Sequence, residues 1–357
     1  MSGNNLAVNY NYDDSATNNS NETFESPWLV DFPPANERVV VESVEKGRVN
    51  ESDFVSYYGA AKVKADKERA ERRHRIRTEN LRGQYGDEVK EIMDADTKIT
   101  GVLNYMINNK ELISGRKIAS VIPSEYDKEV NNSSLIVAME KKGGGALQIN
   151  LDITSCDKVG NIDGLFQDTP GGCTDEIAYF EYGQTRTKLS NIPRYVVGIS
   201  QENAGAAVDK FKISEEINPD QSIATEISHE QDEQTRFKIL SEIYEQAKSR
   251  RDAAKNGSAP KNFQAISDKN AEVYSAVRSE LATMFGLDPI VRTHEELVQF
   301  EEKFNKEYEE ACNLTMELTH DKVYETIVKR SRNLRYGATV AGVMAARDRV
   351  GTNRRHV

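Results

Sequence analysis

Residues 147–155 read LQINLDITS, in which every odd position from Leu147 to Ile153 is apolar and every even position is polar. This period of two predicts a strand with one buried face. Three further short segments have β-rich sequences between turn sequences: GNIDGLF at 160–166, EIAYFEY at 176–182 and RYVVGIS at 194–200. Together they predict four strands, and we expect the rest of the chain to be arranged around them.

Two more strands and a helix are predicted before this stretch. Residues 117–122 and 135–139 are short apolar runs, and 87–109 carries apolar residues at helical spacing. The helix should pack against the sheet. We therefore predict an α+β fold, with a compact mixed β-sheet of about five or six strands, packed helices and a helical C-terminal region.

Composition favours one compact domain with long appendages. The chain has 357 residues, of which 38% are apolar and 29% charged, so it lacks the apolar material for a core along its whole length. We expect a disordered acidic tail at 1–36, a charged helical segment at 37–86, an α+β core domain at 87–215, a helical region at 225–335 and a basic C-terminal tail at 336–357.

Cysteine usage and hydropathy favour a cytoplasmic protein. Cys156, Cys173 and Cys312 have no paired spacing, and the N-terminus has no apolar segment. The small apolar run at 337–346 is roughly half the length that a membrane-spanning helix requires. We expect no membrane role.

Charge is unevenly distributed along the chain. The net charge of −11 argues against a general polyanion binder. Two segments are nevertheless basic: residues 61–82 contain nine basic and four acidic residues, and residues 329–357 contain eight basic residues and one acidic residue. The first segment could track phosphates or be a solvated helix of mixed charge. The second could contact nucleic acid, through Arg330, Arg332, Arg335, Arg347 and Arg349, or the acidic N-terminal tail.

The region after residue 200 has helical signals. Capping-box spacings at 228–231 and 293–296 predict two helix starts, and a further helix is predicted at 263–285. From Leu297 to Leu318 apolar residues recur at steps of three and four. That spacing fits either a coiled-coil seam with a protein partner or a second copy, or an intramolecular helical hairpin.

Asp163 and Glu181 are the candidate metal ligands. If 160–166 and 176–182 were neighbouring strands, the two carboxylates could share Mg²⁺ with a substrate phosphate, and Lys188 follows shortly after. Asp163 and Glu181 also have structural interpretations, as a turn aspartate and as a solvent-facing glutamate on an alternating strand.

Over residues 87–200 the order of these elements resembles the PD-(D/E)XK nuclease superfamily. The resemblance implies that Asp163 and Glu181 hold the metal and that a lysine orients the attacking water. The Glu-X-Lys pattern falls on Glu181-Tyr182-Gly183, so glycine stands in the lysine position and Lys188 would have to replace it. The predicted strands also leave no room for the helix that the family has between its last two strands.

Two functions follow from this pattern. The first is an interaction or structural module with a catalytically inactive nuclease-like core, which binds a partner or itself through the helical region. The alternative is a Mg-dependent nuclease, or a nuclease-derived nucleic-acid-binding protein, that uses Asp163 and Glu181.

Overall fold

The computed structural model describes residues 54–108, 112–113, 118–141, 145–157, 159–167, 172–182, 185–186, 188–204, 221–255 and 264–333. The tails expected at 1–36 and 336–357 lie outside these residues, as do Arg335, Arg347 and Arg349.

Helices account for most of the described chain. They are α2 (Val55–Tyr58), α3 (Ala60–Tyr85), η2 (Gly86–Glu88), α4 (Val89–Asn108), α5 (Glu125–Asn131), α6 (Val159–Gln167), α8 (Gln221–Lys255), α9 (Gln264–Met284), α10 (His294–Thr319) and α11 (Lys322–Asn333). The strands are β1 (Ile118–Val121), β2 (Leu135–Glu140), β3 (Ala146–Thr154), β4 (Cys173–Ile177), β5 (Glu181–Tyr182), β6 (Thr185–Arg186) and β7 (Leu189–Gly198).

Five of these strands form one mixed sheet in the order β1-β2-β3-β7-β4. Strands β1, β2 and β3 form an antiparallel meander, in which Leu135 pairs with Leu151. Strand β7 then pairs in parallel with β3, with Leu151 opposite Tyr195, and α6 lies in the connection between them. Strand β4 completes the sheet by pairing with the first half of β7, while β5 and β6 form a separate small hairpin.

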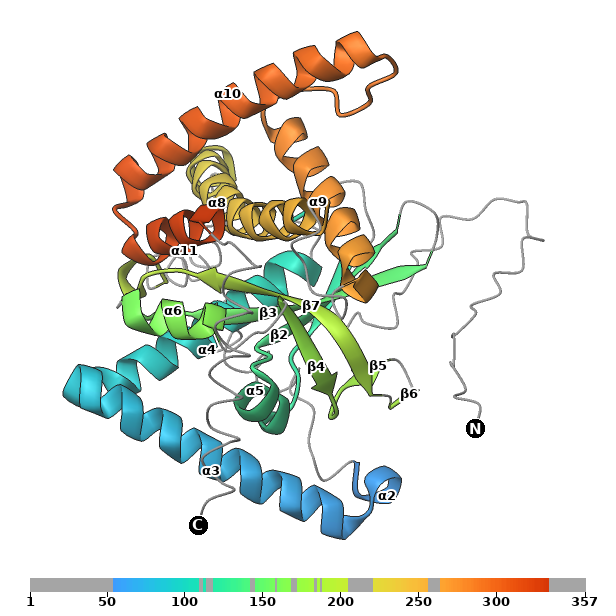
Figure 1. The fold of residues 1–357 in the computed structure, drawn as a ribbon. Coiled ribbons are helices and arrows are strands. Elements are labelled where there is room, and N and C mark those ends of the chain that lie inside the picture. The colour runs from blue at the N-terminus through green and yellow to red at the C-terminus, as the bar shows by residue number, and fades with distance from the viewer. Residues whose placement is uncertain are drawn as a thin grey trace, which may run out of the picture.

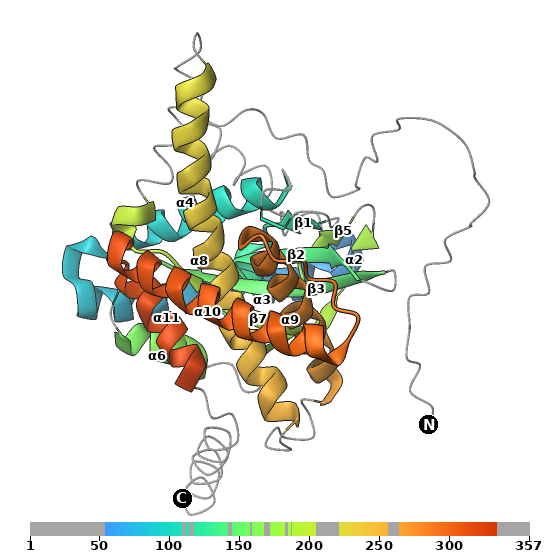
Figure 2. The same cartoon turned by 90° about the horizontal axis from the view of Figure 1, so that it is seen from above.

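Helices cover both faces of this sheet. Figure 1 shows α8, α9 and α10 on one side of the strands, and α3 with α5 on the other. Figure 2, the view from above, shows α8 crossing the strands as a long rod, with α10 and α11 beside it. Helix α4 contacts β1, β2 and β3, whereas α8 and α9 contact β7. The fold is therefore α+β, with a helical C-terminal region packed against the sheet.

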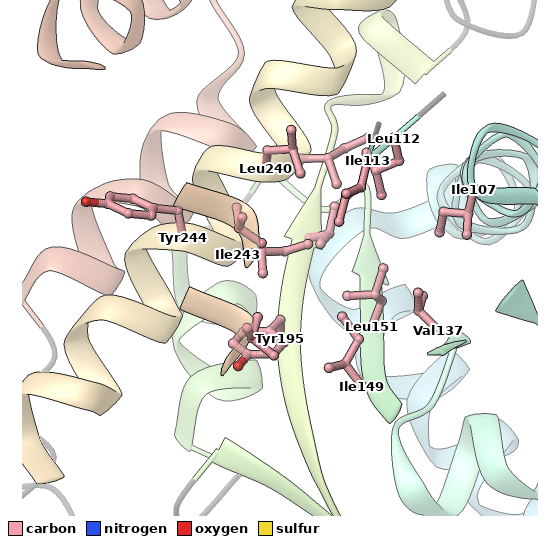
Figure 3. Close-up of a cluster of buried hydrophobic side chains, with 14 of the residues drawn as sticks. Ile107, Leu112, Ile113, Val137, Ile149, Leu151, Tyr195, Leu240, Ile243 and Tyr244 are labelled. Atoms are coloured by element: carbon pink, nitrogen blue, oxygen red, sulfur yellow. The ribbon is translucent and has the colours of Figure 1, made fainter. Parts of the chain in front are cut away.

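The largest core cluster joins the sheet to the C-terminal helices. Leu151 of β3 and Tyr195 of β7 contact this cluster from the sheet, and Ile243 and Tyr244 from α8, as the close-up in Figure 3 shows. Phe304 and Tyr308 of α10 stack on one another in the same cluster, with ring centroids 5.8 Å apart. The C-terminal helices and the sheet thus share one apolar core.

The prediction that β3 has only one buried face was wrong. Its polar positions Asn150, Asp152 and Thr154 are buried as well as its apolar ones. On that second face α6 and α11 cover β7, where Ile162, Val323 and Ile327 contact Val196. Buried polar side chains need partners, and these form the networks described below.

Most predicted strands are confirmed, but residues 160–166 form helix α6 instead of a strand. Ile162, Leu165 and Phe166 lie at i, i+3 and i+4, which is helical spacing, and all three pack against the α11 side of the sheet. Helix α6 lies between β3 and β4, whereas only β5 and β6 lie between β4 and β7, so the last two predicted strands have no helix between them.

Other boundaries also differ. Segment 176–182 is divided between β4 and β5, and the last strand begins at Leu189. Helix α8 begins at Gln221, so the predicted start at 228–231 was wrong, whereas Thr293 and Glu296 form the predicted capping box of α10.

None of the helices within the described ranges combines the length and apolar character needed to span a membrane.

We predict that Gly198→Ala destabilises the fold. A Cβ at Gly198 would lie 2.5 Å from Ile327 Cδ1 and even closer to Val323 Cγ1, so α11 would have to move away from β7. The expected loss is about 1–3 kcal/mol of unfolding free energy, measured by urea denaturation. Gly164→Ala in α6 is the control, because its Cβ meets nothing within 4 Å, and it should be neutral or slightly stabilising. Equal stability of the two variants would contradict the packing.

Candidate functional site

The structure separates the two predicted metal ligands. Asp163 lies on α6, where its Oδ1 is 2.8 Å from Arg330 Nε of α11. Glu181 begins β5, which pairs with β6 outside the main sheet. The premise that these carboxylates occupy neighbouring strands of one sheet was therefore wrong.

Lys188 is also engaged elsewhere. Its Nζ lies 2.7 Å from Glu176 Oε1, and both side chains are on the surface. This ion pair raises the pKa of Lys188, mainly through the hydrogen bond that its ammonium donates to Glu176. A lysine that keeps its proton in this way is a poor general base.

The predicted nucleic-acid contacts on α11 make intramolecular pairs. Arg330 binds Asp163, and Arg332 Nε lies 2.8 Å from Glu245 Oε1 of α8. Arg332 also lies 3.3 Å from Glu309 of α10, so it links three helices. These two arginines therefore hold α11 against its neighbours.

A different group of carboxylates gathers at the centre of the molecule. Asp96 on α4, Glu129 on α5 and Asp152 on β3 are all buried, and we call them with their cationic partners the carboxylate cluster. The cationic partners are Arg77 of α3 and Arg194 of β7.

Asp96 is the most strongly bound member. The Ser155 backbone N–H and hydroxyl each donate to its Oδ1 at 2.7 Å, and Arg77 Nη2 lies 3.1 Å from its Oδ2. Burial raises the pKa of Asp96, while Arg77 and Ser155 oppose that rise. The carboxylate thereby ties α3, α4 and the end of β3 together.

Arg77 also reaches Glu129. Its Nη1 is 3.9 Å from Glu129 Oε1, which lies 3.1 Å from His74 Nδ1 as well. Although burial opposes its charge, Asp96, Glu129 and Asp152 raise the pKa of Arg77. One guanidinium from α3 therefore pairs with carboxylates on two other helices, α4 and α5.

Asp152 has its own arginine. Arg194, which is 2% exposed, pairs with Asp152 and donates from Nη1 to the Leu165 carbonyl at 3.2 Å. Its Nε is buried and finds no hydrogen-bond partner in the structure. Neighbouring Asn150 accepts from Ser133 Oγ at 2.9 Å and donates to Thr174 Oγ1. This whole face of β3 is a hydrogen-bonded polar interior.

A cavity of about 360 Å³ lies beside the cluster, between α3 and α4. His74 connects the two, since it lines the cavity and bonds Glu129. Arg82, Lys90, Asp87 and Asp94 line it with both signs of charge. Over the described part of the chain, no group of three or more His, Cys, Asp or Glu residues is arranged to hold a metal ion.

The sequence patterns did not predict the carboxylate cluster, although the position of one of its members indicates a buried charge. Asp96 falls between Ile92 and Ile99 on the apolar face of α4, at steps of four and three. A carboxylate in that position has to find a buried partner. Arg77 could not be distinguished from the other basic residues of its helix, because its partners come from distant segments.

In comparisons with protein-family models, curated proteins and solved structures, nothing matched this chain.

We predict that Arg77→Leu destabilises the protein because it leaves Asp96 and Glu129 buried without their cation. The Arg77 side chain is 35% exposed, so we expect a smaller effect than for a fully buried ion pair. The unfolding free energy should fall by about 1–3 kcal/mol, measured by chemical denaturation at neutral pH. Arg75→Leu on the solvent side of α3 is the matched control and should change stability by less than about 0.5 kcal/mol. Similar losses in both variants would argue against the pairing.

Asp127 is a second buried carboxylate with a structural role. It accepts hydrogen bonds from the backbone N–H groups of Ala178 and Tyr179, both at 2.7 Å, and from Asn131 at 2.8 Å. These bonds join α5 to the segment after β4. Burial raises the pKa of Asp127 to about 6, against the opposing effect of the hydrogen bonds.

This pKa predicts a pH-dependent stability. An aspartate of the unfolded chain ionises near pH 4, so ionisation between about pH 4 and 6 occurs in the unfolded state first, and stability falls as the pH rises. The unfolding free energy of the wild type should therefore fall, relative to that of Asp127→Asn, by up to about 3 kcal/mol from pH 4 to 7. Chemical denaturation of both proteins at each pH measures this difference. A difference that grows in favour of the wild type over this range would mean that the folded state prefers the ionised carboxylate.

Proposed function

We propose that this protein is a cytoplasmic interaction or structural module that associates with further copies of itself, and that its nuclease-like sheet is a scaffold. One observation carries the proposal. Of the described residues, the large apolar side chains that are exposed lie in only two places: Val55, Tyr57 and Ile76 on α2 and α3, and Ile290, Leu297, Val298, Leu314 and Leu318 on or just before α10.

Helix α10 is the stronger of the two surfaces. One of its faces packs into the core through Phe304 and Tyr308, while Leu314 and Leu318 are 55% and 64% exposed. These leucines are one turn apart, so they project together from the helix. Paired apolar side chains on an otherwise charged helix are typical of a helix-docking surface.

A second copy is the occupant that this distribution favours. The same chain also exposes Val55 and Tyr57 on α2, and Ile76 further along α3, on the other side of the sheet (Figure 1). Two copies could therefore bury both surfaces in one contact, without a different partner.

The carboxylate cluster supports a scaffold role for the sheet. After α4 the chain forms the antiparallel meander β1-β2-β3, with α5 between β1 and β2. Helix α6 and then β4, β5 and β6 come before β7, the parallel neighbour of β3, so the match to the PD-(D/E)XK order is partial. Asp152 and Asp96 are each paired with arginine, which competes directly with a divalent cation for the carboxylate oxygens.

We predict that the full chain self-associates and that Leu314→Ser with Leu318→Ser weakens this association about tenfold to a hundredfold, because less apolar area is buried. Sedimentation velocity over a series of protein concentrations measures the effect. Asn305→Ser with Asn313→Ser, at exposed polar positions of the same helix, is the matched control and should leave association unchanged.

A wild-type chain that stays monomeric at every concentration would refute the self-association. Cleavage of DNA or RNA in Mg²⁺ that Asp163→Ala abolishes would favour the alternative, a metal-dependent nuclease, over the scaffold.

A further inference from the structure

Helices α3 and α10 are matched in length and opposite in charge. Each has 26 residues, which corresponds to about 39 Å of helix. Helix α3 contains nine basic and four acidic residues, whereas α10 contains eight glutamates and two lysines.

The charge excess of α3 faces solvent. Its buried side carries Val63, Asp66, Ala70 and Leu81. Six basic side chains are exposed and are not among its ion pairs: Lys64, Lys67, Arg72, Arg73, Arg75 and Arg82. Exposed Ile76, at 45%, lies among them. This outer side of α3 is called the basic face below.

The outer side of α10 has the opposite character. Glu302, Glu307 and Glu317 are exposed, with no ion pair in the described structure. Glu317 lies next to Leu318, Glu307 two turns before Leu314, and Glu302 more than three turns before it. Lys303 and Lys306 are the lysines of the helix, and Lys306 lies 3.8 Å from Glu310. We refer to this side as the acidic face.

Like charges oppose a symmetric contact through either face. Two acidic faces brought together would place several glutamates opposite one another, and two basic faces would do the same with arginines. A contact between the acidic face of one copy and the basic face of the next pairs these charges. It also buries Leu314 and Leu318 near Ile76.

The positions of α3 and α10 in the fold determine which kind of assembly such a contact produces. Helix α3 lies on one side of the sheet and α10 on the other (Figure 1). Each copy bound through one face therefore still presents its other face. A heterologous contact that does not close on itself extends into an open chain of subunits.

We propose that copies of this protein assemble head to tail, with the acidic face of α10 docked on the basic face of α3 of the next copy. This inference rests on the proposed function and specifies which surfaces meet. Nucleic acid is the other ligand that a basic helix suggests. Glu68, Glu71 and Glu79 on the exposed surface of α3 would repel phosphates, whereas the exposed Lys303 and Lys306 of α10 offer these glutamates partners.

The test uses two charge-reversed full-length variants. In the first, Lys64, Arg72 and Arg75 are changed to Glu; in the second, Glu302, Glu307 and Glu317 are changed to Lys. The self-association constant of each variant alone should be lower than that of the wild type by more than about tenfold at low salt, because one face now repels its counterpart. An equimolar mixture should recover association, since each reversed face meets a complementary one on the other variant.

Controls separate charge complementarity from damage to the fold. Reversal of Glu91 and Glu202, which are exposed and lie on other elements than α3 and α10, should leave association unchanged. Circular dichroism and thermal unfolding should be alike for all variants. Association of the wild type should weaken as salt rises, because the paired charges are exposed.

The outcomes distinguish the inference from the proposed function. Self-association that survives reversal of α3 but not of α10 refutes the head-to-tail contact and leaves self-association standing. A monomeric wild type refutes both. Salt-dependent retention of a DNA duplex by a monomeric wild type, lost on reversal of α3, would assign the basic face to nucleic acid instead. A mixture that fails to recover association also overturns the proposal.

Discussion

The fold depends on how the open edge of β7 is satisfied. Strand β4 pairs with β7 only up to residue 193, so the outward N–H groups of Val196, Gly198 and Ser200 have no strand beside them. Side chains from the helical region take the place of that strand. Gln246 of α8 accepts from Val196 N–H at 2.9 Å and donates to its carbonyl at 2.7 Å, as a neighbouring strand would. Glu242 accepts from Gly198 and Asp321 from Ser200 at 3.1–3.2 Å, so the sheet and the C-terminal helices form one hydrogen-bonded unit.

Buried charge has a similar structural role on both sides of the sheet. At the β7 edge Lys238 pairs with Asp321, and burial raises the pKa of nearby Glu242 well above its usual value. On the other side Arg77 and Arg194 hold Asp96 and Asp152. Such groups are expensive to bury, but once paired they make any other arrangement of the helices worse, because separation would leave a charge without a partner. The buried ion pairs thus stabilise the arrangement of the helices around the sheet, while the outer faces of α3 and α10 remain exposed for contacts.

The sequence was most informative where one period dominated. Strand β3 and the capping box of α10 lie where their patterns predict them, since both depend on local spacing. The prediction of a strand at 160–166 was wrong because so short a segment fits either period, and the burial that favours a helix comes from α11, about 160 residues later. The carboxylate cluster was beyond reach for the same reason. Its members are ordinary in sequence and acquire their meaning from partners on α3, α5 and β7.

The β7 edge also has a consequence for the newly made chain. Ser200 is bonded to Asp321, which is 121 residues further along, so the ribosome must add α8 to α11 before the strand is covered. At typical translation speeds this delay is on the order of ten seconds. For that time an apolar strand with unpaired amides is open to any other nascent chain, and such edges are templates for aggregation. A protein built in this way would benefit from a chaperone that shields the unfinished half during synthesis.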